Sequence, residues 1–172
     1  MTSRGVLLRL LMDKLKIDPQ LKTFRSRLRL QKTVYLLQRM GMPTDFSYGW
    51  YIRGPYSPSL TETAFEEVVK GELREDTSHK DYRLSQDTQE KVNRLEQIIK
   101  KKPDDLLSEE LWLELLASML FYKYEMYFPP SQKRSRENAD WLYERLPPAK
   151  RATFTKHQAR KAQEQLAVLG LW

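Results

Sequence analysis

Few side chains in this 172-residue chain have the types and spacing that catalysis or metal binding requires. The chain has no cysteine, which excludes thiolate metal sites, cysteine nucleophiles and disulfides. Its two histidines, His79 and His157, are not followed four residues later by another histidine or a carboxylate, the spacing typical of a zinc-binding helix. We therefore expect no metal and no other cofactor, and no catalytic role for either histidine.

Other enzyme chemistries also lack their usual signatures. The chain contains neither of the glycine motifs GxxxxGK[ST] and GxGxxG that hold phosphates. The acidic pairs Asp104-Asp105 and Glu109-Glu110 lie where a helix is expected to begin, and the helix dipole favours acids there. The segment 103–114 offers carboxylates without the lysine that a nuclease would need. The sequence thus predicts a protein that is not an enzyme.

The net charge of +7 is unevenly distributed along the chain. Residues 1–40 carry ten Lys or Arg against two acids, 41–128 carry eleven against seventeen, and 129–172 carry nine against four. Two basic ends therefore flank an acidic middle. This pattern is expected either of a protein that binds nucleic acid or an acidic partner, or simply of solvated helix faces.

Basic side chains supply the candidates for contact with DNA or RNA. Arg25, Arg29 and Lys32 follow helical spacing, so we expect them on one face of a helix. Phosphate contacts require little more than basic side chains grouped in this way. The same face could be the solvated side of that helix. The other candidates lie at an expected hairpin tip and in the basic C-terminal part: His79, Lys80, Lys133, Arg134, Lys150, Arg151, Lys156 and Arg160.

The stretch GWYIRGPYSPSL, at 49–60, differs in composition from the rest of the chain. Its prolines fix φ, and its glycines allow a close backbone approach, so we expect a stiff, pre-shaped segment. One interpretation is a helix-entry loop that aromatic side chains hold in place. The other is a surface for a protein partner, since Tyr, Trp and Arg supply most binding anchors. The candidate partner-binding residues are Trp50, Tyr51, Arg53, Gly54, Pro55, Tyr56 and Pro58.

These candidates are positioned by elements that the hydrophobic pattern predicts to be mainly helical. Helices are expected over 4–15, 24–40, 60–70, 87–102, 109–127, 139–146 and 155–169, with 109–127 as the central core helix. Two short strands are expected within 72–85 around a turn at 77–80. The prediction is a single helical domain over 1–172 with one small β-hairpin. Over 58–85 its local order is that of a winged helix.

Two stretches carry a resemblance to known families. RLRLQKTVYLLQ, at 27–38, and YGWYIRGPYSPSLTE, at 48–62, resemble the Panacea-type antitoxin domain, which includes SocA-like proteins, and look closer still to YwgA-type bacterial proteins. Residues 113–124 and 159–171 resemble the C-terminal half of the YwgA-type proteins. The matching motif positions are Leu30, Gln31, Lys32, Tyr35, Trp50, Gly54, Pro55 and Pro58.

The resemblance implies a small, mainly helical, non-enzymatic domain, with the family motifs in 1–103 and a helical half in 104–172. In the Panacea group it also implies neutralisation of a toxin by direct contact. The first hypothesis is therefore a module that docks on one protein partner, either a toxin or a larger complex. The second is a winged-helix-like DNA or RNA binder. No membrane span is expected, and the lack of cysteine fits a cytoplasmic location.

Overall fold

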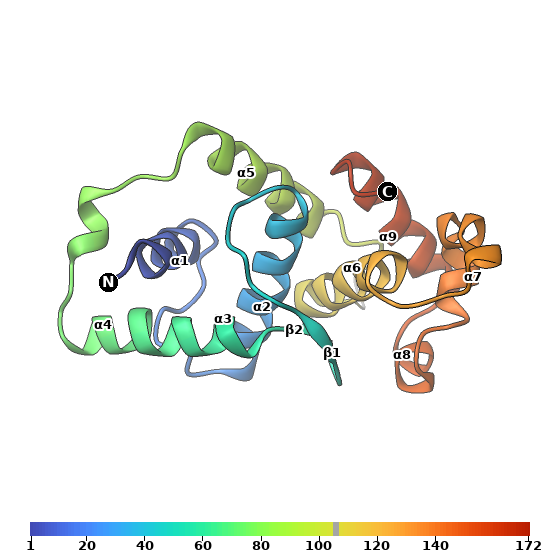
Figure 1. The fold of residues 1–172 in the computed structure, drawn as a ribbon, viewed down its shortest axis with the longest axis horizontal. Coiled ribbons are helices and arrows are strands. Elements are labelled where there is room, and N and C mark those ends of the chain that lie inside the picture. The colour runs from blue at the N-terminus through green and yellow to red at the C-terminus, as the bar shows by residue number, and fades with distance from the viewer. Residues whose placement is uncertain (105–106) are drawn as a thin grey trace.

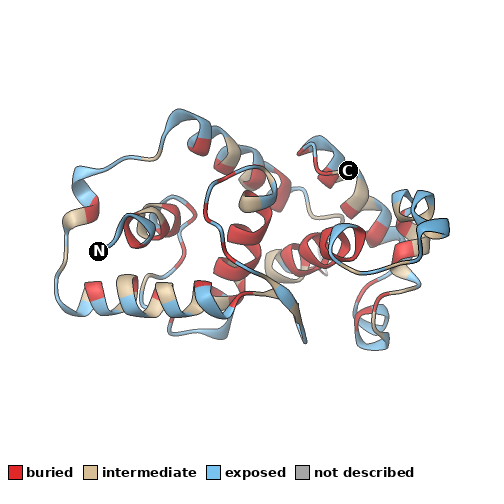
Figure 2. Ribbon diagram, viewed as in Figure 1, coloured by how far each residue is buried: buried red, intermediate tan, exposed pale blue. Residues whose placement is uncertain are grey.

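The apolar stretch expected at 109–127 forms the central helix of the computed structural model, which describes residues 1–104 and 107–172. This helix, α6, covers Glu109–Tyr124, and all its residues from Trp112 to Lys123 are buried. It contacts the small sheet and four helices: α2 (Phe24–Arg39), α5 (Gln86–Lys100), α7 (Ala139–Tyr143) and α9 (Lys156–Val168) (Figures 1 and 2). Asp105, one of the acids considered above, lies outside the described residues.

The other elements surround α6 and α2 (Figure 1). The N-terminal part contains α1 (Ser3–Lys14), α2 (Phe24–Arg39), β1 (Gly49–Tyr51), β2 (Gly54–Tyr56), α3 (Pro58–Thr63), a π-helical segment (Ala64–Val69), α4 (Lys70–Leu73), a 3-10 helix (Ser78–Asp81) and α5 (Gln86–Lys100). After α6 come 3-10 helices at Pro130–Gln132 and Arg134–Glu137, then α7 (Ala139–Tyr143), α8 (Pro148–Thr153) and α9 (Lys156–Val168).

Polar caps determine where most of these helices begin. The side chains of Thr23, Ser85, Ser108 and Asn138 each accept a hydrogen bond from a backbone N–H in the first turn of the helix that follows. Thr155 and Gln158 form the complete capping box of α9. Because such caps satisfy N–H groups that have no partner within the helix, they fix the starts that the sequence indicates.

One hydrophobic cluster joins the two halves of the chain. It contains buried side chains from every part, from Leu8 in α1 to Leu171 after α9. Within it, the ring centroid of Tyr35 on α2 lies 4.9 Å from that of Tyr48 and 6.2 Å from that of Phe121 on α6. The Tyr inside the α2 motif is thus a core residue, and it joins the segment before the hairpin to the central helix.

The predicted class, mainly helical with one small hairpin, is confirmed, but the predicted place of the hairpin is wrong. The two strands pair antiparallel at 49–51 and 54–56, with Trp50 opposite Pro55. Neither Ile52 nor Arg53 has a positive φ, and Gly54 at φ +85° supplies the left-handed residue that closes the turn. The order strand, strand, helix replaces the expected winged-helix order of helix, strand, strand.

Residues 72–85 are held by α1 and the N-terminus rather than by cross-strand pairing. The helical path that begins at Pro58 passes through Gly71, where it was expected to stop, and continues to Leu73. Gly71 instead packs closely against the N-terminus, since a Cβ there would lie 2.9 Å from the terminal methyl of Met1, which would have to shift. The Met1 amine and the Ser78 amide both bond Asp76, and the buried His79 lies in a 3-10 helix that contacts α1.

No helix in the described parts of the chain is long and apolar enough to cross a membrane.

Candidate functional site

The most prominent hollow in the described structure lies beside the hairpin turn. It has a volume of about 530 Å³ and lies between the turn, α2 and the helix that starts at Pro58. Its lining is largely apolar and comes from three separate stretches of sequence: Leu21, Phe24, Arg27, Leu28, Leu30, Gln31, Lys32, Tyr51, Ile52, Arg53, Gly54, Tyr56, Thr61, Ala64 and Phe65. We call this hollow the hairpin groove.

Large apolar side chains stand exposed at the hairpin groove. Ile52 at the tip of the turn is 77% exposed, Tyr51 is 60% exposed and Phe24 at the start of α2 is 56% exposed. The other exposed large apolar side chains in the described regions lie on separate elements: Leu73, Tyr82, Tyr124, Tyr127 and Val168. Three such side chains around one apolar hollow form a local apolar patch, whereas single exposed ones need no explanation.

Gln31 fixes the base of the hairpin to α2. Its amide Nε2 donates to the carbonyl of Ser57 and its Oε1 accepts from the Ser57 N–H, each at 2.9 Å. The same Nε2 donates to Thr61 Oγ1, which donates to the Tyr56 hydroxyl. Gln38, two turns further along α2, holds the backbone of Phe46 with the same pair of bonds. The helix thus uses two glutamines to position the loop that ends in the hairpin.

Lys32 holds the neighbouring part of the hairpin. Its Nζ donates to the Pro55 carbonyl at 2.6 Å, and its side chain is buried. Burial lowers the pKa of Lys32 to about 7, and the positive charges of Lys150 and Arg53 act in the same direction, whereas the Glu114 carboxylate opposes them. The structure thus explains the motif Leu-Gln-Lys at 30–32. Its Leu enters the core, and its two polar residues bind the backbone of residues 55–57.

Glu114 lies at the centre of this group of basic residues. It is 2% exposed on α6, and it forms ion pairs with the buried Lys150 of α8 and with Arg53 at 3.3 Å. Burial lowers the pKa of Lys150, while its hydrogen bond to Glu114 opposes that change. Arg53 keeps about half of its side chain exposed and lies over the ring of Phe24, 5.7 Å from the centroid. The group joins the hairpin, α6 and α8.

Gly54 is required where the hairpin meets α6. It is buried, its φ is +85°, and a Cβ there would lie 2.5 Å from Ser118 Oγ and 3.8 Å from Lys32 Nζ. Ser118 Oγ is itself buried without a hydrogen-bond partner. The glycine therefore satisfies two constraints at once, a left-handed backbone and close contact with the central helix.

The predicted partner-binding residues divide between support and surface. Gly54 and Pro55 are buried, and Trp50 is half-buried against Phe121 and Tyr122 of α6, with centroids 5.7 and 4.8 Å away. Tyr51 and Arg53 are exposed, while Tyr56 is half-buried and stacks beside Tyr51 at 5.4 Å. Pro58 is exposed at the first turn of α3.

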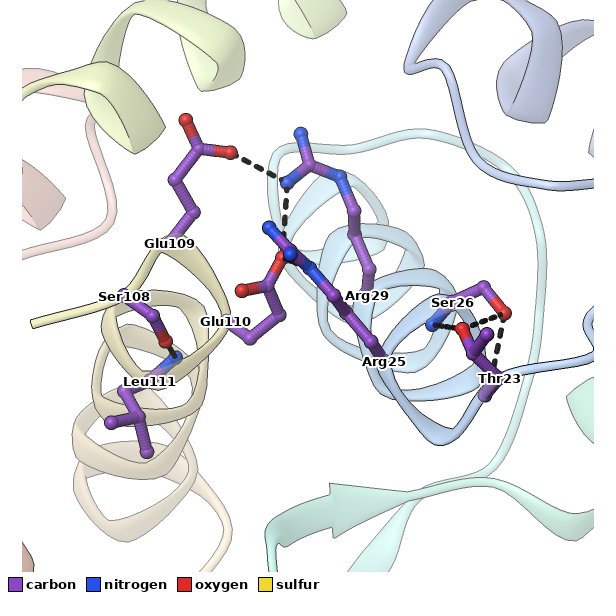
Figure 3. A network of polar contacts seen from close by, with 8 residues as sticks. All are labelled: Thr23, Arg25, Ser26, Arg29, Ser108, Glu109, Glu110 and Leu111. Atoms are coloured by element: carbon purple, nitrogen blue, oxygen red, sulfur yellow. Dashed lines mark hydrogen bonds and ion pairs between the residues drawn. The ribbon is translucent and has the colours of Figure 1, made fainter.

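Two members of the basic face expected on α2 form ion pairs with acids of the same chain (Figure 3), although the Arg25 side chain stays 71% exposed. Arg25 and Arg29 point to the start of α6, where Arg25 Nε meets Glu110 at 2.7 Å and an Arg29 nitrogen meets Glu109 at 2.8 Å. Lys32, the third member, is buried. Helical spacing predicted that these side chains point in one direction. For Arg25 and Arg29 that direction is toward Glu110 and Glu109 of the same chain.

The remaining basic candidates do not gather on one element. Lys150 and His79 are buried, and His79 does not stand at a hairpin tip. Arg160 forms a two-bond pair with Asp140, and Lys156 pairs with Glu144 at 2.6 Å. Within the described residues, the exposed candidates without an ion pair are Lys80, Lys133, Arg134 and Arg151.

Three contributors to the site were not among the sequence candidates. Phe24 and Ile52 looked like an ordinary helix start and an ordinary turn residue. Glu114 did carry a signal, because a lone acid in the run LWLELLASML must be buried beside a cation if the helix is central. Among the described residues, no three His, Asp or Glu side chains come together as a metal site would require.

In comparisons with known proteins, no family model, no curated protein and no solved structure matches this chain.

Replacing Gly54 tests the contact between hairpin and central helix. We expect Gly54→Ala to lower the free energy of unfolding by about 1–2 kcal/mol from the left-handed backbone alone, with a further cost from the Ser118 contact. Gly49→Ala is the matched control, because a Cβ there meets nothing within 4 Å and its φ is not positive; we expect a change within about 0.5 kcal/mol. Urea unfolding followed by circular dichroism measures both.

Adding Ser118→Ala to Gly54→Ala should restore part of the lost stability, because the nearest atom is removed. Ser118→Ala alone should cost little, since its hydroxyl has no partner. Equal losses in the two glycine variants would contradict the packing described.

The buried amine of Lys32 should make stability depend on pH. In the unfolded chain a lysine keeps its proton to about pH 10.5, whereas folded Lys32 releases it near pH 7. Between these values the unfolded state binds more protons, so rising pH favours the folded state by up to about 1.4 kcal/mol per pH unit. We therefore expect the stability of the wild type relative to Lys32→Met to increase from pH 6.5 to 9.5.

The difference between the two proteins removes the contributions of groups present in both, including the Met1 amine, whose pKa is raised by Asp76 and whose effect has the opposite sign. Denaturant unfolding at four pH values gives the comparison. A difference that stays constant across this range would show that Lys32 keeps its ordinary pKa.

Proposed function

We propose that this protein is a non-enzymatic binding module that docks on one protein partner through the hairpin groove. The observation that carries the proposal is the exposure of Phe24, Tyr51 and Ile52 around one apolar hollow. A volume of about 530 Å³ is within the range of sites that receive a ligand or the side chains of a partner. Contact of these apolar side chains with water is unfavourable in free energy, and a partner that buries them would remove that cost.

The rigid support of the groove favours the same function. Gln31, Lys32 and Glu114 bind the hairpin from behind, so Ile52 and Tyr51 stand on a fixed backbone. A surface that is already ordered loses little conformational entropy when a partner binds, which improves affinity. Gln31 and Lys32 thus line the groove and also hold the backbone beside it, while Tyr51 and Ile52 stay exposed.

The finer form of the proposal is an antitoxin-like protein or an accessory subunit that regulates its partner. Its support is the resemblance of the Leu-Gln-Lys and Gly-Pro motifs to the Panacea-type domain. The motif residues Gln31, Lys32, Gly54 and Pro55 build the support of the groove, so proteins that share the motif would share the surface that the support presents.

Nucleic-acid binding is the second candidate, favoured by the exposed Lys80, Lys133, Arg134 and Arg151 and by the net charge of +7. The two functions respond differently to salt. Binding through about six phosphates weakens on the order of a thousandfold between 50 and 200 mM salt, whereas an apolar interface depends little on it.

A pair of variants with matched exposure tests the docking proposal. Ile52 is 77% exposed at the hairpin groove, and Leu73 is 78% exposed at the end of α4. We expect Ile52→Ser to reduce capture of the partner from host extract at least about tenfold, and Leu73→Ser to leave it unchanged, because only the first side chain lies at the interface. Quantitative mass spectrometry after washes at 50 and 500 mM salt measures the capture.

The expected result is one stoichiometric protein that survives the high-salt wash and depends on Ile52. Equal capture by the two variants would contradict docking at the groove. Nucleic acid that elutes with salt, with no constant protein, would favour the second candidate instead.

A further inference from the structure

The charge around the hairpin groove has one sign. Arg27, Lys32 and Arg53 line it, and no Asp or Glu is among the described residues that do. An apolar hollow with only cations at its wall has a positive potential, which the low-dielectric lining strengthens. The charge therefore restricts which apolar segments the groove accepts.

Nearby acids offset these cations only in part. Glu114 and Glu110 lie outside the lining of the groove, in a smaller neighbouring hollow of about 340 Å³ that shares Phe24, Leu28 and Arg53 with it, and Glu110 pairs with Arg25. Glu114 already pairs with the buried Lys150 and also lies near Lys32. One carboxylate thus faces Lys150, Arg53 and the partly protonated amine of Lys32, and the group has an excess of positive charge.

Arg53 is the cation most able to take a second carboxylate. Its side chain is about half exposed, and its single contact with Glu114, at 3.3 Å, is longer than an ideal charged hydrogen bond. Lys150 would remain with Glu114 if Arg53 turned away. The guanidinium has five donors, so it can also bind a new carboxylate while keeping the old one.

Arg27 adds a second cation on the α2 side of the groove. One of its terminal nitrogens donates to the carbonyls of Leu21 and Lys22, which fixes the guanidinium at the start of α2. In the described parts of the chain it forms no ion pair with a carboxylate. Its charge is therefore positioned but not neutralised.

We propose that the hairpin groove receives a partner segment with two or more apolar side chains and an adjacent carboxylate, the carboxylate contacting Arg53 in a groove whose positive charge Arg27 increases. This inference rests on the proposed docking function and specifies the chemistry of the partner. A basic segment would meet Arg27, which has no carboxylate partner in the described parts of the chain, and the half-exposed Arg53, and the same charge disfavours it. A double-stranded nucleic acid would satisfy the cations but would leave the apolar wall in contact with water or phosphate.

A library of random 12-residue peptides displayed on phage supplies the test. Selection uses the full chain at 150 mM salt, and the same selection on Ile52→Ser defines the background. We expect the wild type to enrich peptides with clustered apolar residues and at least one Asp or Glu. The most enriched peptide is then synthesised in two forms, one with its acids and one with each acid replaced by the matching amide.

Fluorescence anisotropy of the two labelled peptides measures the contribution of the carboxylate. We expect the amide form to bind the wild type on the order of tenfold more weakly, as a charged hydrogen bond would require. Arg53→Gln should weaken the acidic form by a similar factor and affect the amide form little. Arg134→Gln, which also removes one positive charge but lies on a separate 3-10 helix, should change neither.

The outcomes separate the two proposals. Ile52-dependent peptides without acids, with basic residues, or with acids that contribute nothing would overturn the carboxylate inference and leave docking at the groove in place. A library that enriches nothing on the wild type above Ile52→Ser would overturn both. Equal losses for the two peptide forms with Arg53→Gln would assign Arg53 a structural role and also overturn the inference.

Discussion

The contact between α2 and the backbone of residues 55–57 is the constraint on which the rest of the site depends. Adjacent residues of α2, Gln31 and Lys32, bind the Ser57 backbone and the Pro55 carbonyl. An isolated two-stranded hairpin is marginal in water, and β2 contains a proline that cannot donate to the sheet. The hairpin therefore owes its shape to the helix behind it rather than to its own strand pairing.

Holding the hairpin with a buried lysine has an electrostatic cost, and this cost explains which charged residues make up the site. Lys32 is buried, and a buried ammonium is tolerated only with a partner of opposite charge or with a lowered pKa. The structure supplies both, through Glu114 on α6 and a pKa near 7. Because Glu114 also serves Lys150 and Arg53, the base of the groove keeps an excess of positive charge. The residues that hold the hairpin thus make the apolar surface rigid, and their charge favours a partner that carries negative charge.

The helices were predictable because their signals are local. Caps such as Ser108 and Thr155 mark starts, and the apolar run of α6 identifies the central helix. The hairpin was misplaced because its strands have three residues each and include Pro55, whereas 72–85 contains β-formers at plausible spacing. Contacts of His79 and Asp76 with the N-terminal region determine the conformation of 72–85. These contacts are tertiary, so no local sequence pattern shows them.

The candidate site was predicted only in part. The composition of 49–60 indicated a shaped segment, and Tyr51 and Arg53 do face outward. The groove itself joins α2, the turn and the helix after Pro58, so its existence depends on packing between separate stretches. Helical spacing correctly grouped Arg25 and Arg29, but it could not show that acids of α6 lie opposite.

Amide hydrogen exchange at Ser57, followed by NMR, tests the central claim most directly. If Gln31 holds the hairpin, the Ser57 amide should be protected in the wild type and should exchange much faster in Gln31→Ala, while α6 amides stay protected. Gln38→Ala is the matched control, since it should release the Phe46 amide and leave Ser57 protected. A Ser57 amide that exchanges freely in the wild type, or stays protected in Gln31→Ala, would contradict the account.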